Sequence, residues 1–353
     1  MKLSQVGEFG LINRIAKTAS RTSASALVGI GDDAAALSLS ASQTLLATTD
    51  VLLEDVHFDL SFTDFYSLGW KSAAVNLSDI AAMGGVPRFC LTALGIPARI
   101  SVEQVLDFYR GFNALLRRHA TALVGGDTCA SGEGLFISVT ALGEAEPRRI
   151  ITRSGAQPGD LLFVTGALGD SAAGLEILKR RGVGRTVRNS GAGAKRLIEK
   201  HLRPVPRVSE GRKIALSGCA SAMIDISDGL SSDLWHICEQ SGVGAEIISD
   251  RLPISTALGK TAKNMTKHVL HYALSGGEDY ELLFTVPHSR MKKLSSLEIG
   301  ATEIGIVTPG TGVFLIDGKG ERTPLAPSGY DHFRSAASCS AGASQKGRFS
   351  RKT

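Results

Sequence analysis

The sequence predicts a two-domain α/β protein on three observations. The chain has 353 residues, which is room for two domains of roughly 100–200 residues each. Apolar runs of strand length alternate with segments whose apolar residues recur at helical spacing. A second strand-turn-helix unit begins near residue 158, where Pro, Gly and Asp together mark a turn.

The first half contains two predicted helices among predicted strands. Residues 65–83 have helical apolar spacing and end in a glycine pair that stops a helix. Residues 101–119 read as an amphipathic helix that Ser101 opens as the N-cap. The strands are predicted from β-rich apolar runs at 44–51, 89–96 and 135–143.

The second half repeats the pattern. A buried strand is predicted at 161–166, with a glycine turn leading into a helix that reaches residue 180. Further helices are predicted at 208–216 and 229–242, and the Gly-, Arg- and Ser-rich stretch 181–195 is predicted to be a mobile loop.

The predicted domains are residues 1–147 and 148–334, followed by a tail at 335–353. The tail is small, polar and basic, so it cannot offset its ordering entropy and is predicted to be disordered. The net charge is +5 and the pI is near 9.0, and much of the excess positive charge lies in residues 179–213 and in this tail. A basic nucleic-acid or scaffold surface is therefore the weaker interpretation, and aromatic interleaving is also missing.

Composition also bears on location and redox state. No uncharged apolar run approaches the ~18 residues that span a bilayer, and the N-terminal residues lack a secretory apolar region. We therefore predict a soluble, cytoplasmic protein without a membrane partner.

The five cysteines are widely spaced without a C-x-x-C pair, which favours reduced thiols over disulfides or a zinc site.

Aspartates recur in short motifs bounded by Gly or Ser. The motifs are GDDAA (31–35), TTD (48–50), NLSD (76–79), GGDT (125–128) and DISDG (225–229). Carboxylates are hard oxygen ligands suited to Mg²⁺, which proteins usually bind through a few carboxylates together with substrate phosphates. Acids that meet in the fold would therefore form a metal site for a polyphosphate.

Each motif alone has a structural alternative. GDD alone is more often an ordinary turn, and one of Asp225 and Asp228 is expected to cap the following helix. His57 alone is more often a hydrogen-bonded structural histidine. GGEDYELLF (276–284) is a stronger signal, because three acids crowd before a buried apolar run. A Walker phosphate loop and the protein-kinase motifs are absent from the sequence, so another scaffold must hold any nucleotide.

Taken in order, the motifs resemble the thiamine-monophosphate kinase family over about residues 4–334. They are GEFGLI (7–12), IGDDAA (30–35), TTDVLLEDVHF (48–58), WKSAAVNLSDIAAMGG (70–85), GGDT, TRSGAQPGD (152–160), TGALGDSAAG (165–174), HLRPVPR (201–207), DISDGLSSDL (225–234), SGGEDYELLFT (275–285) and GYDHF (329–333). Each is modest alone, but their ordered concurrence is specific. The family belongs to the superfamily of aminoimidazole ribonucleotide synthetase and selenophosphate synthetase.

The resemblance implies both a fold and an activity. The fold is the two-domain aminoimidazole ribonucleotide synthetase-like α/β (α+β) arrangement, in a homodimer whose N-terminal sheets pair into a barrel-like core. The activity is transfer of the γ-phosphoryl group of ATP to thiamine monophosphate, giving thiamine diphosphate, with several Mg²⁺ ions and, in many members, K⁺. We expect direct in-line transfer without a covalent nucleophile, because the acids fit metal ligation better than nucleophilic attack. A dedicated general base is not required, because a phosphate monoester with a second pKa of ~6 is already largely ionised at neutral pH.

The resemblance also assigns residues. Metal ligands fall on Asp33, Thr48, Thr49, Asp50, Asp79, Asp127, Asp225 and Asp228, with Asp32 as an additional contact. ATP contacts fall on Tyr109, Gly126, Asp127, Arg153 and Ser227, and substrate contacts on His57, Glu278 and Tyr330. Since both domains contribute ligands, the active site is expected in the cleft between them.

The nearest alternative is another ATP-using synthetase of the superfamily, acting on aminoimidazole ribonucleotide precursors or selenide. Selenophosphate synthetases typically carry a reactive Cys or selenocysteine near a glycine-rich N-terminus. The first cysteine here is Cys90, inside a predicted strand. That difference favours the kinase.

Overall fold

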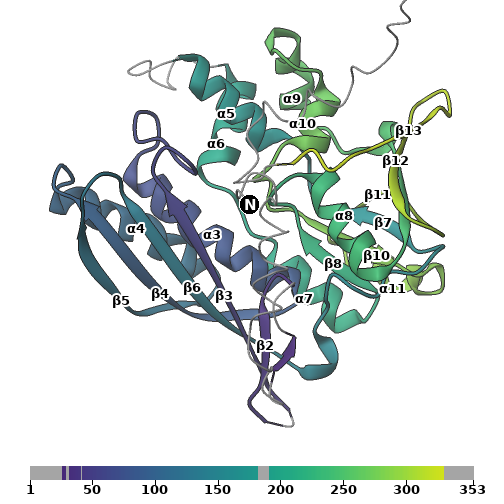
Figure 1. The fold of residues 1–353 in the computed structure, drawn as a ribbon, viewed down its shortest axis with the longest axis horizontal. Helices are drawn as coiled ribbons and strands as arrows, with labels where there is room; N and C mark the ends of the chain where they lie inside the picture. The colour runs from purple at the N-terminus through teal and green to yellow at the C-terminus, as the bar shows by residue number, and fades with distance from the viewer. Residues whose placement is uncertain (1–25, 29–31, 41, 182–190, 330–353) are drawn as a thin grey trace, which may run out of the picture.

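The computed structural model describes residues 26–28, 32–40, 42–181 and 191–329, and two units lie side by side in it (Figure 1). Each unit is built on its own β-sheet, the first from strands within residues 26–145 and the second from strands within 161–324. Within these described ranges, no helix is long and apolar enough to cross a membrane.

The first unit contains a six-stranded sheet. Its strands lie in the order β1 (Ala26–Val28), β2 (Ala35–Ser38), β3 (Thr44–Leu53), β6 (Phe136–Ala145), β4 (Val86–Pro97) and β5 (Ala122–Ser131). Neighbouring strands are antiparallel except β4 and β5, which are parallel. A parallel pair needs a crossover connection, and helix α4 (Val102–Arg118) provides it.

Helices α3 (Phe65–Ala82) and α4 pack against each other, and α3 also contacts β3, β4 and β6. The α3 helix begins where the Asp64 side chain accepts the Ser67 N–H at 2.8 Å. The two helices approach closely at glycines, because a Cβ on Gly69 would lie 1.9 Å from the Phe108 carbonyl oxygen. This close packing fixes α3 against the sheet.

The opposite face of the sheet, which we call the outer sheet face, carries exposed apolar side chains. They are Val51, Leu53, Phe89, Leu91, Val124 and Phe136, each 37% to 56% exposed. Strand alternation explains the two faces of β4: Cys90, Thr92 and Leu94 are buried, whereas Phe89 and Leu91 point the other way. Exposed apolar side chains gathered on one face are typical of interaction surfaces.

The second unit contains a seven-stranded sheet. Its order is β13 (Arg322–Pro324), β12 (Gly312–Ile316), β9 (Gly244–Ile248), β11 (Thr302–Thr308), β7 (Leu161–Val164), β10 (Leu282–Val286) and β8 (Ala222–Asp225). The neighbours are antiparallel except β9 and β12. The helices of this unit are α5 (Asp170–Arg181), α6 (Ala192–Leu202), α7 (Val208–Ser217), α8 (Leu230–Ser241), α9 (Thr256–Thr261), α10 (Val269–Ser275) and α11 (Met291–Ser295).

Helix α3 forms the junction between the two units, where it contacts α6, α7 and β8 (Figure 1). Its polar side chains are buried there and bond to the second unit. The Ser78 hydroxyl donates to Asp225 at 2.6 Å, and Lys71 Nζ lies 2.7 Å from Glu278 Oε1. Buried polar groups need such partners, so these bonds fix how the units dock.

Most predicted elements are confirmed. The helices predicted at 65–83, 101–119, 208–216 and 229–242 form α3, α4, α7 and α8 with ends within one residue of the prediction. The strands predicted at 44–51, 89–96, 135–143 and 161–166 form β3, β4, β6 and β7. No strand was predicted over β5, because the glycine pair in GGDT lowers β-propensity.

Two local predictions are wrong. Helix α6 begins at Ala192, inside the stretch predicted as a loop, while residues 182–190 lie outside the described ranges. The N-cap of α8 is Gly229, so neither Asp225 nor Asp228 occupies that position. Gly229 has a φ of 118°, which glycine adopts without strain. The tail 335–353 also lies outside the described residues.

Candidate active site

Three carboxylates from distant parts of the chain converge at the junction between the units. Asp33 precedes β2, Asp79 lies near the end of α3, and Asp225 ends β8. One oxygen of each lies within 4.8 Å of the others. Both units therefore contribute to this carboxylate cluster.

Burial, reinforced by repulsion between neighbouring carboxylates, changes the acidity of the cluster. It raises the pKa of Asp225 to about 8 and that of Asp50, on β3, to about 6. The pKa of Asp79 is raised well above its usual range for the same two reasons. The Oδ2 atom of Asp33 is buried without a hydrogen-bond partner. This set of crowded, hard oxygen donors fits a divalent cation such as Mg²⁺.

Neutral side chains orient the carboxylates. The Thr48 hydroxyl donates to Asp79 Oδ2 at 2.5 Å, so Thr48 lies in direct contact with the cluster. Asn76 Oδ1 accepts the backbone N–H of Asp50 at 3.2 Å. Ser78 performs the same orienting role for Asp225. Asn76 and Ser78 lie within the NLSD motif, but neither is assigned a role from the sequence, because a buried polar position in an alanine-rich helix does not reveal its partner.

Thr49 lies on the other face of β3. Its hydroxyl donates to the Val139 carbonyl at 3.0 Å and accepts from the Thr140 hydroxyl at 3.2 Å. Successive strand residues point to opposite faces, so Thr48 and Asp50 face the cluster while the Thr49 side chain faces away. Thr49 therefore presents only its backbone, and not its hydroxyl, toward the cluster.

Arg153 and Asp32 lie beside the cluster. Arg153 Nη2 donates to Asp33 Oδ1 at 2.7 Å, and its backbone N–H points at the Asp32 carboxylate, with oxygens at 3.2 and 3.3 Å. Burial and the neighbouring Asp33 raise the pKa of Asp32 to about 6. The Nε atom of Arg153 is buried without a hydrogen-bond partner. A positive group with a spare donor thus sits next to the carboxylates.

Three of the predicted ATP contacts line one open hollow of about 470 Å³ beside β5. Its lining is Thr92, Tyr109, Leu123, Gly125, Gly126, Asp127 and Thr128. The Tyr109 hydroxyl lies 3.0 Å from that of Thr92. A Cβ at Gly126 would lie 2.1 Å from the Thr92 carbonyl oxygen, so only glycine fits there.

Sheet register separates this hollow from the carboxylate cluster. Asp50, Val139, Thr92 and Gly126 form one row across β3, β6, β4 and β5. Three strand spacings of ~4.8 Å place Gly126 about 14 Å from Asp50. Asp127 follows Gly126 and accepts the Thr128 N–H at 2.8 Å. Among the described residues, no hydrogen bond or carboxylate contact joins Asp127 to the cluster, so its assignment as a metal ligand stays a prediction.

The DISDG loop is braced by an acid that the sequence did not single out. Asp233, on α8, accepts the backbone N–H groups of Asp228 and Gly229 at 3.3 and 3.1 Å. Its position four residues after Gly229, in the first turn of the helix, is the signal that could have found it. The Ser227 carbonyl accepts the Glu278 N–H at 2.7 Å, which holds this loop against GGEDYE.

The three acids of GGEDYE each have a different partner. Glu278 pairs with Lys71 and lies 3.2 Å from His201 Nδ1. Asp279 accepts N–H groups at the start of α5, and Glu281 is held by Arg207 and Lys200. Only Glu278 is partly exposed, at 27% of its side chain. The crowding noted in the sequence is therefore structural for Asp279 and Glu281.

The remaining predicted substrate contacts are His57 and Tyr330. His57 is half-buried, and its Nδ1 accepts the Leu53 N–H at 3.0 Å, which closes the turn after β3. Tyr330 lies outside the described residues.

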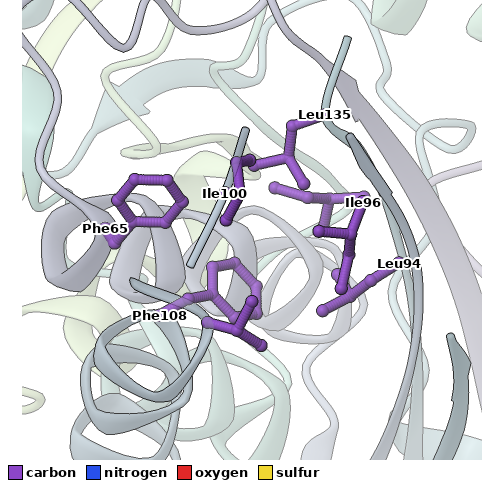
Figure 2. A pocket seen from close by; sticks show the side chains of 8 residues that line it. Phe65, Leu94, Ile96, Ile100, Phe108 and Leu135 are labelled. Atoms are coloured by element: carbon purple, nitrogen blue, oxygen red, sulfur yellow. The ribbon is translucent and has the colours of Figure 1, made fainter. Parts of the chain in front are cut away.

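A small apolar pocket of about 10 Å³ lies in the first unit between α4 and the sheet (Figure 2). Its lining side chains are Phe65, Leu94, Ile96, Ile100, Val105, Phe108, Leu135 and Ile137. The space is about the size that one water occupies, and no polar side chain lines it. It is a packing gap and not a ligand site.

Comparison with known proteins identifies the family. Residues 31–145 match the family model "AIR synthase related protein, N-terminal domain", and residues 157–318 match the corresponding C-terminal domain. The chain is 41% identical over 333 residues to the thiamine-monophosphate kinase of Aquifex aeolicus, covering 94% of this chain and 100% of that relative. It is 39% identical to the enzyme of Bacillus subtilis, covering 93% and 99%. The chain belongs to the thiamine-monophosphate kinase family.

Solved structures agree with this family membership. The structure of AaThiL complexed with AMPPCP and TMP superposes with a TM-score of 0.82 at 40% identity, covering 94% of this chain and 99% of that one. Thiamine-monophosphate kinase from Stenotrophomonas maltophilia gives a TM-score of 0.72 at 39% identity, covering 90% and 98%. The hydrogenase maturation protein HypE, in the HypE-HypF complex, shares the fold. It superposes with a TM-score of 0.66 at 21% identity, covering 89% of this chain and 98% of that one.

Proposed function

We propose that the chain transfers the γ-phosphoryl group of ATP to the phosphate of thiamine monophosphate, giving thiamine diphosphate. The observation that carries the proposal is the buried carboxylate cluster of Asp33, Asp79 and Asp225 beside Arg153, in a chain of this family. The relative AaThiL was solved with AMPPCP, an analogue of ATP, and with TMP. Because ATP is a cytoplasmic co-substrate, we place the reaction in the cytoplasm.

The proposed metal ligands are those that the resemblance implies. Asp33, Asp50, Asp79 and Asp225 would hold Mg²⁺, with Thr48, Thr49, Asp127, Asp228 and Asp32 completing several sites and K⁺ as a further cation. Bound Mg²⁺ would neutralise phosphate charge and align the reacting groups. The crowding of the acids and the unpartnered Asp33 Oδ2 support a cation at the first of these sites.

The chain's own residues would position two polyanions and would not supply a base. The second pKa of a phosphate monoester is ~6, so the attacking oxygen is largely ionised at neutral pH. Arg153 has an unpartnered, buried Nε beside Asp33, and it would contact a phosphate in the geometry that guanidinium favours. Positioning and charge stabilisation account for most of the catalysis of phosphoryl transfer.

The two substrates would bind on either side of the carboxylate cluster. The hollow lined by Tyr109, Gly126 and Asp127 would receive ATP, with Arg153 and Ser227 contacting its phosphates. Glu278, with His57 and Tyr330, would contact thiamine monophosphate. The separation of about 14 Å between Asp50 and Gly126, estimated from the sheet register, suits an extended triphosphate between them.

We also propose a homodimer in which the outer sheet faces of two copies pack into a barrel-like core. The exposed apolar side chains of that face support it, as does the edge of the sheet at β5, which pairs only with β4 among the described strands. The domains proposed are residues 1–147 and 148–334.

A coupled assay of ADP formation tests the function. ATP turnover should depend on thiamine monophosphate and not on thiamine or on unrelated phosphate monoesters. Asp50→Asn should abolish turnover while the protein stays folded by circular dichroism. Equal turnover with every phosphate would reject the proposed acceptor, and label retained on the protein after incubation with γ-labelled ATP would reject direct transfer.

A further inference from the structure

Lys71 is a buried lysine at the junction of the two units. It lies on α3, its side chain is 2% exposed, and its Nζ lies 2.7 and 2.8 Å from the two carboxylate oxygens of Glu278. Lysine is almost never fully buried unless it is paired, because removing its charge from water is costly. The pair joins the first unit to the GGEDYE segment of the second.

Glu278 is held in an unusual conformation. Its φ is 64°, in the left-handed region that a residue with a side chain adopts only at some strain. Its backbone N–H donates to the Ser227 carbonyl at 2.7 Å, which fixes the strained segment against the DISDG loop. The Glu278 side chain is 27% exposed, whereas Lys71 beneath it is 2% exposed. The Glu278 side chain is therefore partly exposed, while both of its carboxylate oxygens contact the buried ammonium group of Lys71.

Three charged or titratable groups face Glu278 from the elements packed around it. Lys71 comes from α3, His201 from α6, and Lys179 from α5 acts at longer range. Burial and the nearby Lys71 charge lower the pKa of His201 to about 3, so its ring is neutral at physiological pH. A neutral ring offers a hydrogen bond but no charge. Lys71 is therefore the direct counter-ion of Glu278.

We propose that Lys71 is a positioning residue for thiamine monophosphate, holding the Glu278 carboxylate ionised and aimed toward the substrate from across the junction of the units. This inference rests on the proposed function, in which Glu278 contacts that substrate. It ties the second-unit substrate contact to α3, the same helix that carries Asp79 and Ser78. Correct docking of the two units thus completes both the carboxylate cluster and the substrate contact at Glu278.

The test compares Lys71→Met and Lys71→Arg with Trp70→Phe. Trp70 is adjacent on α3, and its Nε1 donates to the Pro204 carbonyl at 2.7 Å, so the control removes a contact to the second unit that does not involve Glu278. Lys71→Met should raise KM for thiamine monophosphate by about tenfold or more, the loss expected for one charge-assisted hydrogen bond. KM for ATP should change by less than about twofold.

Two further readouts separate positioning from a structural role. At saturating Mg²⁺, the ratio of kcat/KM for thiamine monophosphate in Lys71→Met to that in the wild type should rise with pH between 6 and 9, because a buried carboxylate without its counter-ion holds its proton. Lys71→Arg should restore most of the wild-type KM. Trp70→Phe should lower Tm while keeping the wild-type pH profile and both KM values.

A double variant covers the case in which Lys71→Met does not fold. Lys71→Met with Glu278→Gln removes both buried charges, and it should bind thiamine monophosphate no more weakly than Glu278→Gln alone. Weaker binding by the double variant than by Glu278→Gln, or equal rises in both KM values where Lys71→Met folds, would overturn the role of Lys71. A wild-type protein without turnover that depends on thiamine monophosphate would instead overturn the proposed function, which is a separate outcome.

Discussion

At the scale of single residues, Asp33, Asp79 and Asp225 place three acidic groups within reach of one ion. Two unit charges 4.8 Å apart repel by about 3 kcal/mol at an effective dielectric constant of 20. Arg153 pairs directly with Asp33 alone among the three. Burial and this repulsion together raise the pKa values of the carboxyl groups, so the repulsion is relieved either by protons or by a cation.

That competition predicts that Mg²⁺ affinity rises with pH. Asp50 and Asp225 have pKa values raised to about 6 and about 8, so at pH 6 Asp225 holds a proton and Asp50 is about half protonated, and a metal must displace these protons. As pH rises from 6 to 8 these protons leave, and the Kd for Mg²⁺ should fall. Titration calorimetry in buffers of different ionisation enthalpy measures both the Kd and the protons released. A Kd independent of pH, with no proton release, would contradict the cluster as the metal site.

Ser78→Ala tests the orientation of Asp225. Loss of the 2.6 Å hydrogen bond should weaken Mg²⁺ binding or activity by about 10–100-fold, as for other partners of metal ligands. Ser72→Ala is the matched control, because its hydroxyl donates only to the Leu68 carbonyl within the same buried helix. Steady-state kinetics at varied Mg²⁺ distinguishes them. Similar losses in both variants would mean that helix stability, and not Asp225, is affected.

The acids could be predicted from sequence, but most of their partners could not. Asp33, Asp79 and Asp225 lie in Gly- or Ser-bounded motifs whose order resembles a family. Lys71 and Ser78 are buried and bond to Glu278 and Asp225 of the second unit, and no pattern within the helix reveals those contacts. Their roles follow from tertiary structure alone.

At the scale of elements, α4 connects the site to the sheet. It makes the parallel pairing of β4 with β5 possible, and β5 carries Gly126 and Asp127 of the hollow. Its ends were predicted well, because Ser101 and Gln104 form the capping box that the sequence suggests. The β5 strand was missed because its glycines serve close backbone approach, which local propensity does not describe.

Ser101→Ala should destabilise the protein by about 1 kcal/mol, since the Gln104 N–H at the start of α4 loses its acceptor, the Ser101 hydroxyl. Ser101→Asn keeps a capping side chain and should stay within a few tenths of a kcal/mol of the wild type. Urea unfolding followed by circular dichroism measures the free energy of unfolding. If Ser101→Ala is as stable as the wild type, the capping box contributes nothing to this helix.

At the scale of the whole molecule, the two units were predictable as separate strand-and-helix patterns, but their docking was not. The carboxylate cluster exists only because Asp225 of the second sheet meets α3 of the first unit. The register that places Gly126 about 14 Å from Asp50 likewise depends on strand order, which the sequence does not encode locally. The expectation that the active site lies in the cleft between the domains came from the family resemblance.

The outer sheet face leads to the last prediction, which concerns self-association. Phe89 and Leu91 are 47% and 38% exposed on β4, so replacing both with Lys should leave the single chain folded but place charges in an apolar interface. The double variant should sediment as a monomer where the wild type sediments as a dimer. Val102→Lys is the control, because Val102 is 69% exposed on α4, away from that face. A variant that dimerises like the wild type, or a wild type that is monomeric at micromolar concentration, would show that this face is not the dimer interface.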